Sequence, residues 1–176
     1  MEANSISPKI QKFFSADEIK QRVQMLSAEI SQDYIQHELH IVGILKGSFI
    51  FLADLVRSLT IPGFIHFLHA SSYGDKKTSS GQVRIDHALN LYKKHVLVVE
   101  DIIDTGSTIN RVARELQSQK PASLKICTLL DKPAARQFPI DVQYTGFTVT
   151  NQFFVGYGMD FSERYRILPY IAILKE

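Results

Sequence analysis

Short apolar runs alternate along the chain with segments whose apolar residues recur every three or four positions, as in a helix. The runs LHIVGIL, HVLVVE and SLKICTLLD each adjoin such a helical segment. Parallel strands need crossover connections of this kind, and strands covered on both faces by helices carry few polar side chains. We therefore expect an α/β protein with a mostly parallel central sheet flanked by helices.

The order of the predicted elements follows from these patterns and from turn signals. Ser15 and Glu18 have the spacing of a capping box and start the first helix. In chain order the other predicted elements are a strand at Leu39–Leu45, a helix at Phe49–Leu59, a strand from Gly63, a loop at Ser72–Gln82, a strand at Val83–Leu89, a strand at His95–Glu100, a helix at Ser107–Gln117 and a strand at Ser123–Asp131. The runs VQYTGFTV, QFFVGYG and YIAILK predict short strands that form a small β appendage or an edge of the sheet.

Composition excludes several classes of protein. The chain has 176 residues, 45% of them hydrophobic and 22% charged, which suits one folded domain spanning residues 1–176. A net charge of only +2 gives no reason to expect a nucleic-acid or membrane partner. We find no signal-peptide pattern and no apolar run near the roughly 20 residues of a membrane span. Cys127, the single cysteine, is expected to be buried, and the location is expected to be cytoplasmic.

The stretch VLVVEDIIDTGSTI places three carboxylates after a buried strand. Glu100 and Asp101 end the strand, Asp104 follows, and Thr105–Thr108 lead into a helix. Ligands of open α/β sheets bind beyond the carboxyl ends of the strands, and a hydroxyl-rich turn at a helix N-terminus suits a phosphate. Carboxylates suit ribose hydroxyls or Mg²⁺, so the stretch predicts a site for a phosphorylated ribose. On the residues alone, a turn that merely caps the helix remains an alternative.

This same stretch, with four apolar positions, two acidic residues and then D-T-G-x-T, closely resembles the phosphoribosyl pyrophosphate (PRPP) motif of type I phosphoribosyltransferases. The resemblance implies the type I phosphoribosyltransferase fold, with a small β-rich hood. It implies that Glu100 and Asp101 hold the ribose and Mg²⁺, and that Asp104 is the general base near the purine N7. The PRPP-binding residues that it implies in this motif are Glu100, Asp101, Ile103, Asp104, Thr105, Gly106, Ser107 and Thr108.

Two further segments resemble parts of the same family. ILKGS is similar to the pyrophosphate-binding loop, which implies contacts from Leu45, Lys46 and Gly47 and, in many relatives, a cis peptide before the lysine. SSYGDKKTSSGQVRI is similar to the flexible loop that closes over the active site, with Ser72 and Tyr73 matching its signature. Read without the resemblance, the two segments are an ordinary strand–helix turn and a solvated surface loop.

The segments LLDKPAAR and FFVGYGMDFSERYR resemble the 6-oxopurine branch, the hypoxanthine–guanine phosphoribosyltransferases. This implies that Lys132 donates to the purine O6, that Phe153 stacks on the base, and that Arg166 contacts pyrophosphate. Asp160 is implied to ligate a second Mg²⁺. The purine-binding residues implied are Ile102, Lys132, Phe153, Phe154 and Asp160, with Phe154 and Asp160 acting through their backbone groups. The chain departs from the family at two positions: many relatives have an acidic residue in place of His66, and the position of Phe154 is more often aliphatic.

We therefore expect a Mg²⁺-dependent purine-salvage transferase that converts hypoxanthine or guanine and PRPP to the nucleoside monophosphate and pyrophosphate. A homodimer or homotetramer is implied by the resemblance alone. One alternative is a transferase that prefers xanthine, since these bases differ only at C2. The other is a PRPP-sensing regulator that binds nucleic acid, against which stand the nearly neutral charge and the lack of a helix-turn-helix segment. The six histidines show no metal-ligand spacing.

Overall fold

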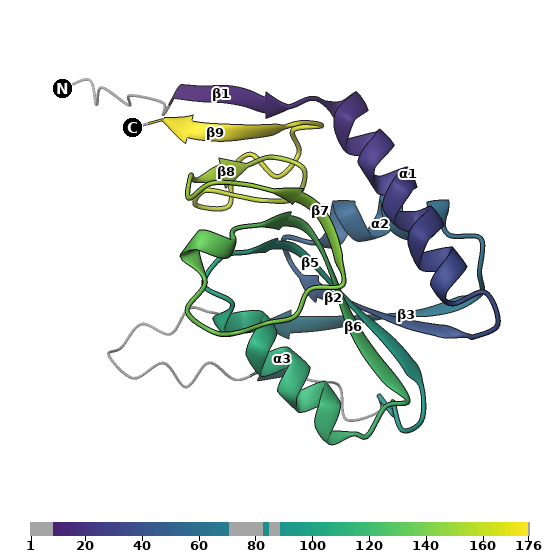
Figure 1. Ribbon diagram of the computed structural model, residues 1–176. Coiled ribbons are helices and arrows are strands. Elements are labelled where there is room, and N and C mark those ends of the chain that lie inside the picture. The colour runs from purple at the N-terminus through teal and green to yellow at the C-terminus, as the bar shows by residue number, and fades with distance from the viewer. Residues whose placement is uncertain (1–8, 71–82, 85–88, 176) are drawn as a thin grey trace.

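The chain forms a large and a small β-sheet in the computed structural model, which describes residues 9–70, 83–84 and 89–175 (Figure 1). The large sheet has the strand order β4-β3-β2-β5-β6-β7. Its strands are β2 (Leu39–Leu45), β3 (Gly63–Ala70), β4 (Val83–Arg84), β5 (His95–Ile103), β6 (Ser123–Asp131) and β7 (Tyr144–Thr148). All neighbouring pairs are parallel except β3 and β4, so the predicted α/β fold is confirmed.

Three α-helices of the described residues cover the two faces of this sheet. The helices are α1 (Ala16–Asp33), α2 (Phe49–Ser58) and α3 (Ser107–Ser118), and a short 3₁₀-helix follows β6 at Pro133–Ala135. α1 and α2 lie on one face and α3 on the other (Figure 1). Successive residues of a strand point to opposite faces. Leu97 and Val99 therefore join the core under α1 and α2, whereas Val96 and Val98 pack under α3.

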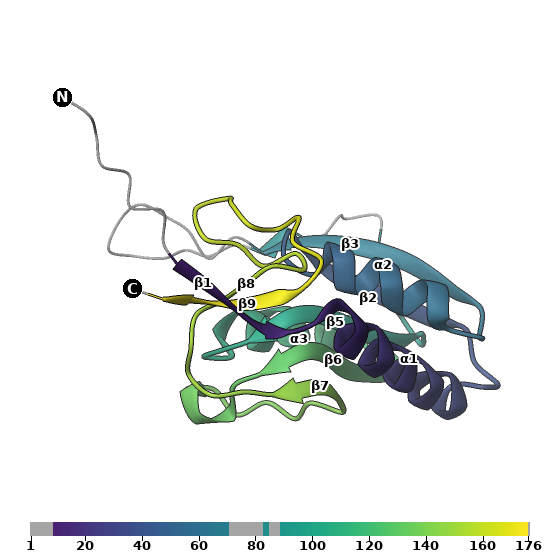
Figure 2. The ribbon, with the colours of Figure 1, turned by 90° about the horizontal axis from the view of Figure 1, so that it is seen from above.

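The small sheet is antiparallel and joins the two ends of the described chain. Its strands are β1 (Lys9–Phe14), β8 (Phe154–Val155) and β9 (Ile171–Lys175), in the order β1-β9-β8. Figure 2 shows this hood beside the large sheet. The segment between β8 and β9 contacts α2. Tyr157 in that segment donates a hydrogen bond to the Asp54 carboxylate on α2, which ties the hood to the large sheet.

The sequence prediction needs several adjustments. The last third supplies both of the predicted outcomes, because β7 forms an edge of the large sheet while β8 and β9 form the hood. β1 was not predicted, since KIQKFF is mostly exposed and becomes a strand by pairing with β9. β5 runs three residues beyond the predicted end at Glu100. The predicted loop lies outside the described residues, as does most of the strand expected after it.

Two local predictions are confirmed. The Ser15 hydroxyl accepts a hydrogen bond from the Glu18 amide, and the Glu18 carboxylate accepts one from the Ser15 amide, so the capping box starts α1. Cys127 is fully buried, and this burial raises the pKa of its thiol. Within the part of the chain that the structure describes, no helix is both long and apolar enough to cross a membrane.

Candidate active site

Two adjoining hollows open at the carboxyl ends of β2 and β5. The larger is a cleft of ≈ 770 Å³ between the loop after β2 and the segment that connects β8 to β9. The smaller, of ≈ 100 Å³, lies in the turn between β5 and α3. Glu100, Ile102 and Thr108 line both hollows. The end of β5 and the start of α3 therefore join them into one site, at the place expected for an open α/β sheet.

Ten predicted residues line the cleft, and eight line the smaller hollow. Those in the cleft are Leu45, Lys46, Gly47, Glu100, Asp101, Ile102, Thr108, Phe153, Asp160 and Arg166. Those in the smaller hollow are Glu100, Ile102, Ile103, Asp104, Thr105, Gly106, Ser107 and Thr108. Lys132 and Phe154 line neither hollow, and Ser72 and Tyr73 lie outside the described residues. The site also contains residues that we did not predict, namely Ile44, His69, Phe161, Ser162 and Glu163 in the cleft and Ile109 in the smaller hollow.

Glu100 and Asp101 bring two carboxyl groups into the buried end of the site. They are only 7% and 8% exposed. Burial raises the pKa of Glu100 well above its ordinary value, and the neighbouring Asp101 carboxyl raises it further. Burial also raises the pKa of Asp101. A cation or a pair of ligand hydroxyl groups beside these carboxylates would offset the cost of burying their charge.

The loop after β2 approaches Asp101 closely. The peptide bond between Leu45 and Lys46 is cis, as in many members of the resembled family. A Cβ atom added to Gly47 would lie only 1.9 Å from the Asp101 Oδ2 atom, so no side chain fits there. Ser48, which is buried, donates to the Ile44 carbonyl at 2.6 Å and fixes the turn into α2. The loop backbone and the Asp101 carboxylate therefore share one small space.

The turn between β5 and α3 leaves a helix N-terminus facing the smaller hollow. Gly106 precedes α3 with φ 84, a left-handed conformation that glycine adopts without a steric penalty. It supplies no side-chain cap, and the Thr105 hydroxyl accepts from the first helix amide, that of Ser107, at 3.3 Å, so the amides that follow keep capacity for an anion. The segment after β6 also holds the turn, because the Thr105 carbonyl accepts hydrogen bonds from the Gln137 and Phe138 amides at 2.9 Å and 3.2 Å.

Lys132 and Asp104 come together because β5 and β6 run parallel. Ile103 on β5 is in register with Asp131 on β6. Asp104, which follows β5, therefore lies next to Lys132, which follows β6. The Lys132 Nζ atom is 3.0 Å from Asp104 Oδ2, with the lysine side chain 5% exposed and the aspartate side chain 48% exposed. The ammonium also lies 5.7 Å from the centre of the Phe154 ring. Lys132 and Asp104, which are predicted to contact O6 and N7 of one purine, are thus neighbours.

The two phenylalanines at the start of β8 have different environments. Phe153 is half-exposed at the cleft and packs edge-on against Phe161, with 5.7 Å between ring centres. Phe154 is buried in the core, where its ring contacts Phe13. Phe153 therefore presents an aromatic side chain to a ligand, whereas the Phe154 ring serves the hood.

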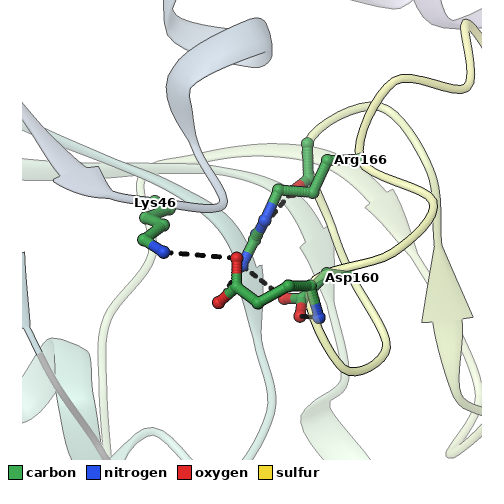
Figure 3. A network of polar contacts seen from close by, with 5 residues as sticks. Lys46, Asp160 and Arg166 are labelled. Carbon is green, nitrogen blue, oxygen red and sulfur yellow. Dashed lines mark hydrogen bonds and ion pairs between the residues drawn. The ribbon is translucent and has the colours of Figure 1, made fainter.

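A network of charged side chains lines the cleft (Figure 3). Lys46 reaches in from the loop after β2, and Arg166 and Asp160 come from the segment between β8 and β9. Arg166 pairs with Asp160 at 2.8 Å and donates to the Gly158 carbonyl at 2.8 Å. Glu163 contacts both Lys46, at 3.2 Å, and Arg166, at 3.4 Å. Glu163 lies within the segment FFVGYGMDFSERYR, but an isolated acidic residue in a turn carries no signal of this contact.

A metal ion has no complete set of protein ligands in this site. Among the described residues, no group of three or more histidine, cysteine, aspartate or glutamate side chains is placed to hold a metal ion. Glu100 and Asp101 supply carboxylate oxygens, the donors that Mg²⁺ prefers. Mg²⁺ usually keeps several waters and binds substrate phosphates as well as one or two carboxylates. The residues present fit a magnesium ion that arrives with a phosphorylated ligand.

Comparison with known proteins agrees with this geometry. The profile of the phosphoribosyl transferase domain matches residues 12–162. The chain belongs to the phosphoribosyltransferase family. It is 44% identical to the hypoxanthine phosphoribosyltransferase of Haemophilus influenzae over 90% of this chain and 91% of the relative. It is also 44% identical to the hypoxanthine-guanine phosphoribosyltransferase of Streptococcus pneumoniae, over 92% of this chain and 91% of that protein.

Solved structures give the same result for the fold of this phosphoribosyltransferase. A crystal structure of a hypoxanthine-guanine phosphoribosyltransferase from Bacillus anthracis superposes with a TM-score of 0.87 at 39% identity, covering 96% of this chain and 99% of that one. The Trypanosoma cruzi hypoxanthine phosphoribosyltransferase in a ternary substrates complex has a TM-score of 0.87 at 37% identity, covering 96% of each chain. The type I phosphoribosyltransferase fold with a β-rich hood is therefore confirmed.

Proposed function

We propose that this phosphoribosyltransferase transfers the phosphoribosyl group of PRPP to hypoxanthine or guanine, releasing pyrophosphate. The observation that carries the proposal is the ion pair between Lys132 and Asp104. In a 6-oxopurine, O6 and N7 lie next to one another on the same edge of the ring. A cationic donor and a carboxylate acceptor that are already neighbours match this edge, because Lys132 can donate to O6 while Asp104 accepts from N7–H. A 6-amino group cannot accept the lysine hydrogen bond.

The rest of the site supplies a place for each part of PRPP. The smaller hollow, with its helix N-terminus and hydroxyl side chains, suits the 5′-phosphate. Glu100 and Asp101 suit the ribose hydroxyls, and Lys46 and Arg166 suit the pyrophosphate. Arg166 Nε is buried and has no hydrogen-bond partner among the described residues, which supports an anion there.

The residues of this chain divide the work of the reaction. The bond from ribose to pyrophosphate breaks as the purine N9 attacks, through a transition state with oxocarbenium character. Lys46 and Arg166 stabilise the negative charge of the departing pyrophosphate. Asp104 accepts or shares the N7 proton as positive charge develops on the purine. Phe153 holds the base by stacking, a contact worth about 1–3 kcal/mol in nucleic-acid sites.

Magnesium is the cofactor that we propose. Glu100 and Asp101 would hold one ion, and Asp160 would contact a second. Bound Mg²⁺ neutralises part of the pyrophosphate charge. The Phe154 and Asp160 backbones, together with Ile102, complete the proposed purine pocket.

A coupled assay tests the proposed function directly. The protein is incubated with PRPP, Mg²⁺ and hypoxanthine, guanine, xanthine or adenine in turn, and pyrophosphate release is followed. We expect turnover with hypoxanthine and guanine and none with adenine. A preference for xanthine would support the alternative drawn from the sequence, and no turnover with any base would refute the proposal. The relatives named above are transferases, so nothing favours the alternative of a nucleic-acid-binding regulator.

We also propose a homodimer or homotetramer in the cytoplasm. The study of the T. cruzi relative concerns its oligomeric state together with its activity. In this chain, Phe64, Ile65 and Phe67 on β3 are each about half-exposed, which supports a contact between copies. Light scattering during size-exclusion chromatography tests this, and a monomer at micromolar concentration would contradict it.

A further inference from the structure

The Glu163 carboxylate bridges the two cations of the pyrophosphate side. Its Oε2 atom lies 3.2 Å from Lys46 Nζ, and its Oε1 atom lies 3.4 Å from Arg166 Nη2. Lys46 lies on the loop after β2 and Arg166 on the segment between β8 and β9, and Figure 3 shows their charged groups directed toward one another. Each carboxylate oxygen therefore contacts a different cation.

This arrangement resembles the way in which a phosphoryl group would be held. Carboxylate and phosphate both present pairs of anionic oxygens to cationic hydrogen-bond donors. The Lys46 and Glu163 side chains are 60% and 66% exposed, so water weakens their ion pair and an incoming anion can replace it. The position of the Glu163 backbone does not depend on its carboxylate, because its amide donates to Asp160 Oδ2 at 2.8 Å.

We propose that the Glu163 carboxylate occupies the pyrophosphate position in the ligand-free protein, and that PRPP must displace it from Lys46 and Arg166. The inference rests on the proposed function, which assigns these two cations to pyrophosphate. Glu163 then lowers the affinity of the site for pyrophosphate, since the ligand must break two ion pairs before it forms its own. It also speeds product release, because the carboxylate restores its contacts as pyrophosphate leaves.

The test is the binding of pyrophosphate with Mg²⁺ to the whole protein, measured by isothermal titration calorimetry. Glu163→Gln keeps the length of the side chain and removes its charge. We expect the Kd of this variant to fall about two- to tenfold, since two exposed ion pairs no longer compete. Stopped-flow measurements should show slower pyrophosphate dissociation. An unchanged or higher Kd for Glu163→Gln would overturn the inference.

Two further variants separate direct contact from a general effect of charge. Glu163→Asp keeps the charge but shortens the side chain, so direct occupancy predicts a smaller fall in Kd. Glu29→Gln removes the same charge from an exposed position on α1 and should leave the Kd unchanged. A Kd that stays at the wild-type value in Glu163→Asp, or falls equally in Glu29→Gln, would overturn the inference by indicating long-range repulsion.

Lys46→Gln distinguishes a failure of this inference from a failure of the proposed function. Lys46 is exposed, so the replacement should not affect folding. If Lys46→Gln weakens pyrophosphate binding while Glu163→Gln does not strengthen it, only the role of Glu163 is refuted. If Lys46→Gln leaves the Kd unchanged, the assignment of the pyrophosphate site is itself refuted.

Discussion

The Lys132 ammonium lies 3.0 Å from Asp104 Oδ2, at the point where the parallel strands β5 and β6 end. The lysine side chain is almost fully buried, and the aspartate is half-exposed. The protein therefore carries a charged donor and an acceptor side by side before any base arrives. A purine that binds both groups takes over contacts that the pair already makes, and the two strand ends fix the spacing of those contacts.

Replacing Asp104 with Asn tests the general base. The Asn side-chain oxygen can still accept from Lys132, but an amide cannot take the N7 proton. We expect kcat to fall by about 10²- to 10⁴-fold, while the affinity for PRPP changes by less than about threefold. Steady-state kinetics and calorimetric titration with PRPP measure the two effects. Equal losses in turnover and in PRPP affinity would contradict a role as base.

The Lys132→Met variant tests recognition of the 6-oxo group. Methionine fills a similar volume and cannot donate to O6. We expect kcat/KM for hypoxanthine to fall roughly 10- to 100-fold, because a hydrogen bond from a charged donor contributes about 1.5–3 kcal/mol. PRPP affinity and the melting temperature serve as controls. Retention of the wild-type preference for hypoxanthine over adenine would exclude Lys132 from base recognition.

Gly47→Ala tests the close approach of the loop to Asp101. The added Cβ atom would lie 1.9 Å from the carboxylate, so either the loop or Asp101 must move. We expect kcat/KM to fall on the order of 10²-fold, as a displacement of catalytic groups by about 1 Å can cause. Gly63→Ala is the control, because Gly63 lies at the amino end of β3, away from the site. Its added Cβ atom would also meet a neighbour, the Leu39 carbonyl, at 3.0 Å. Equal loss in both variants would indicate a general effect on the sheet.

His40 and His66 predict a dependence of stability on pH. Their rings stack with His40 Nδ1 3.1 Å from His66 Nε2, and His40 Nε2 is buried with no hydrogen-bond partner among the described residues. Burial lowers the pKa of both histidines. The His66 ring and Lys94 lower the pKa of His40 further, whereas Glu38 acts in the opposite direction.

The direction of the pH effect follows from the protons bound in each state. Histidines of the unfolded chain have a pKa of about 6.5. Just below that pH these histidines bind more protons in the unfolded chain than in the folded chain. The contribution of this histidine pair to the free energy of unfolding should therefore decrease as the pH falls from about 6.5 toward the lowered pKa values, and then level off. The raised pKa values of Glu100 and Asp101 contribute in the opposite direction, so the effect of the pair is the difference between the wild type and a histidine variant. Urea unfolding across this range measures the slope, which His66→Gln should reduce. An unchanged slope in that variant would exclude the histidine pair as its source.

The sequence predicted those parts of the fold that depend on local patterns. Leu39–Leu45 and Ser123–Asp131 are continuous apolar runs, and both became strands with the predicted bounds. β1 was missed because most of its side chains are exposed and its strand structure depends on pairing with β9 at the other end of the described chain. Local periodicity cannot report a partner so distant in the sequence.

The site was predicted motif by motif, and the contacts between motifs were not. The PRPP motif and the segment with Lys132 were each assigned a role, but the pairing of Lys132 with Asp104 depends on the register of β5 and β6. Glu163 was missed for the same reason, because its significance comes from Lys46 on a distant loop. The assigned role of each residue stays a prediction until the variants are measured.

The pairing of β1 with β9 also bears on how the protein is made. The ribosome synthesises β1 long before β9, the strand with which β1 pairs. β1 can form its backbone hydrogen bonds only after Ile171–Lys175 has been made. The Leu174 amide donates to the Phe153 carbonyl at 2.9 Å, so that strand also anchors the aromatic residue at the cleft. Translation that terminates before Ile171 therefore yields a polypeptide that contains the whole PRPP motif but has no anchored platform for the purine.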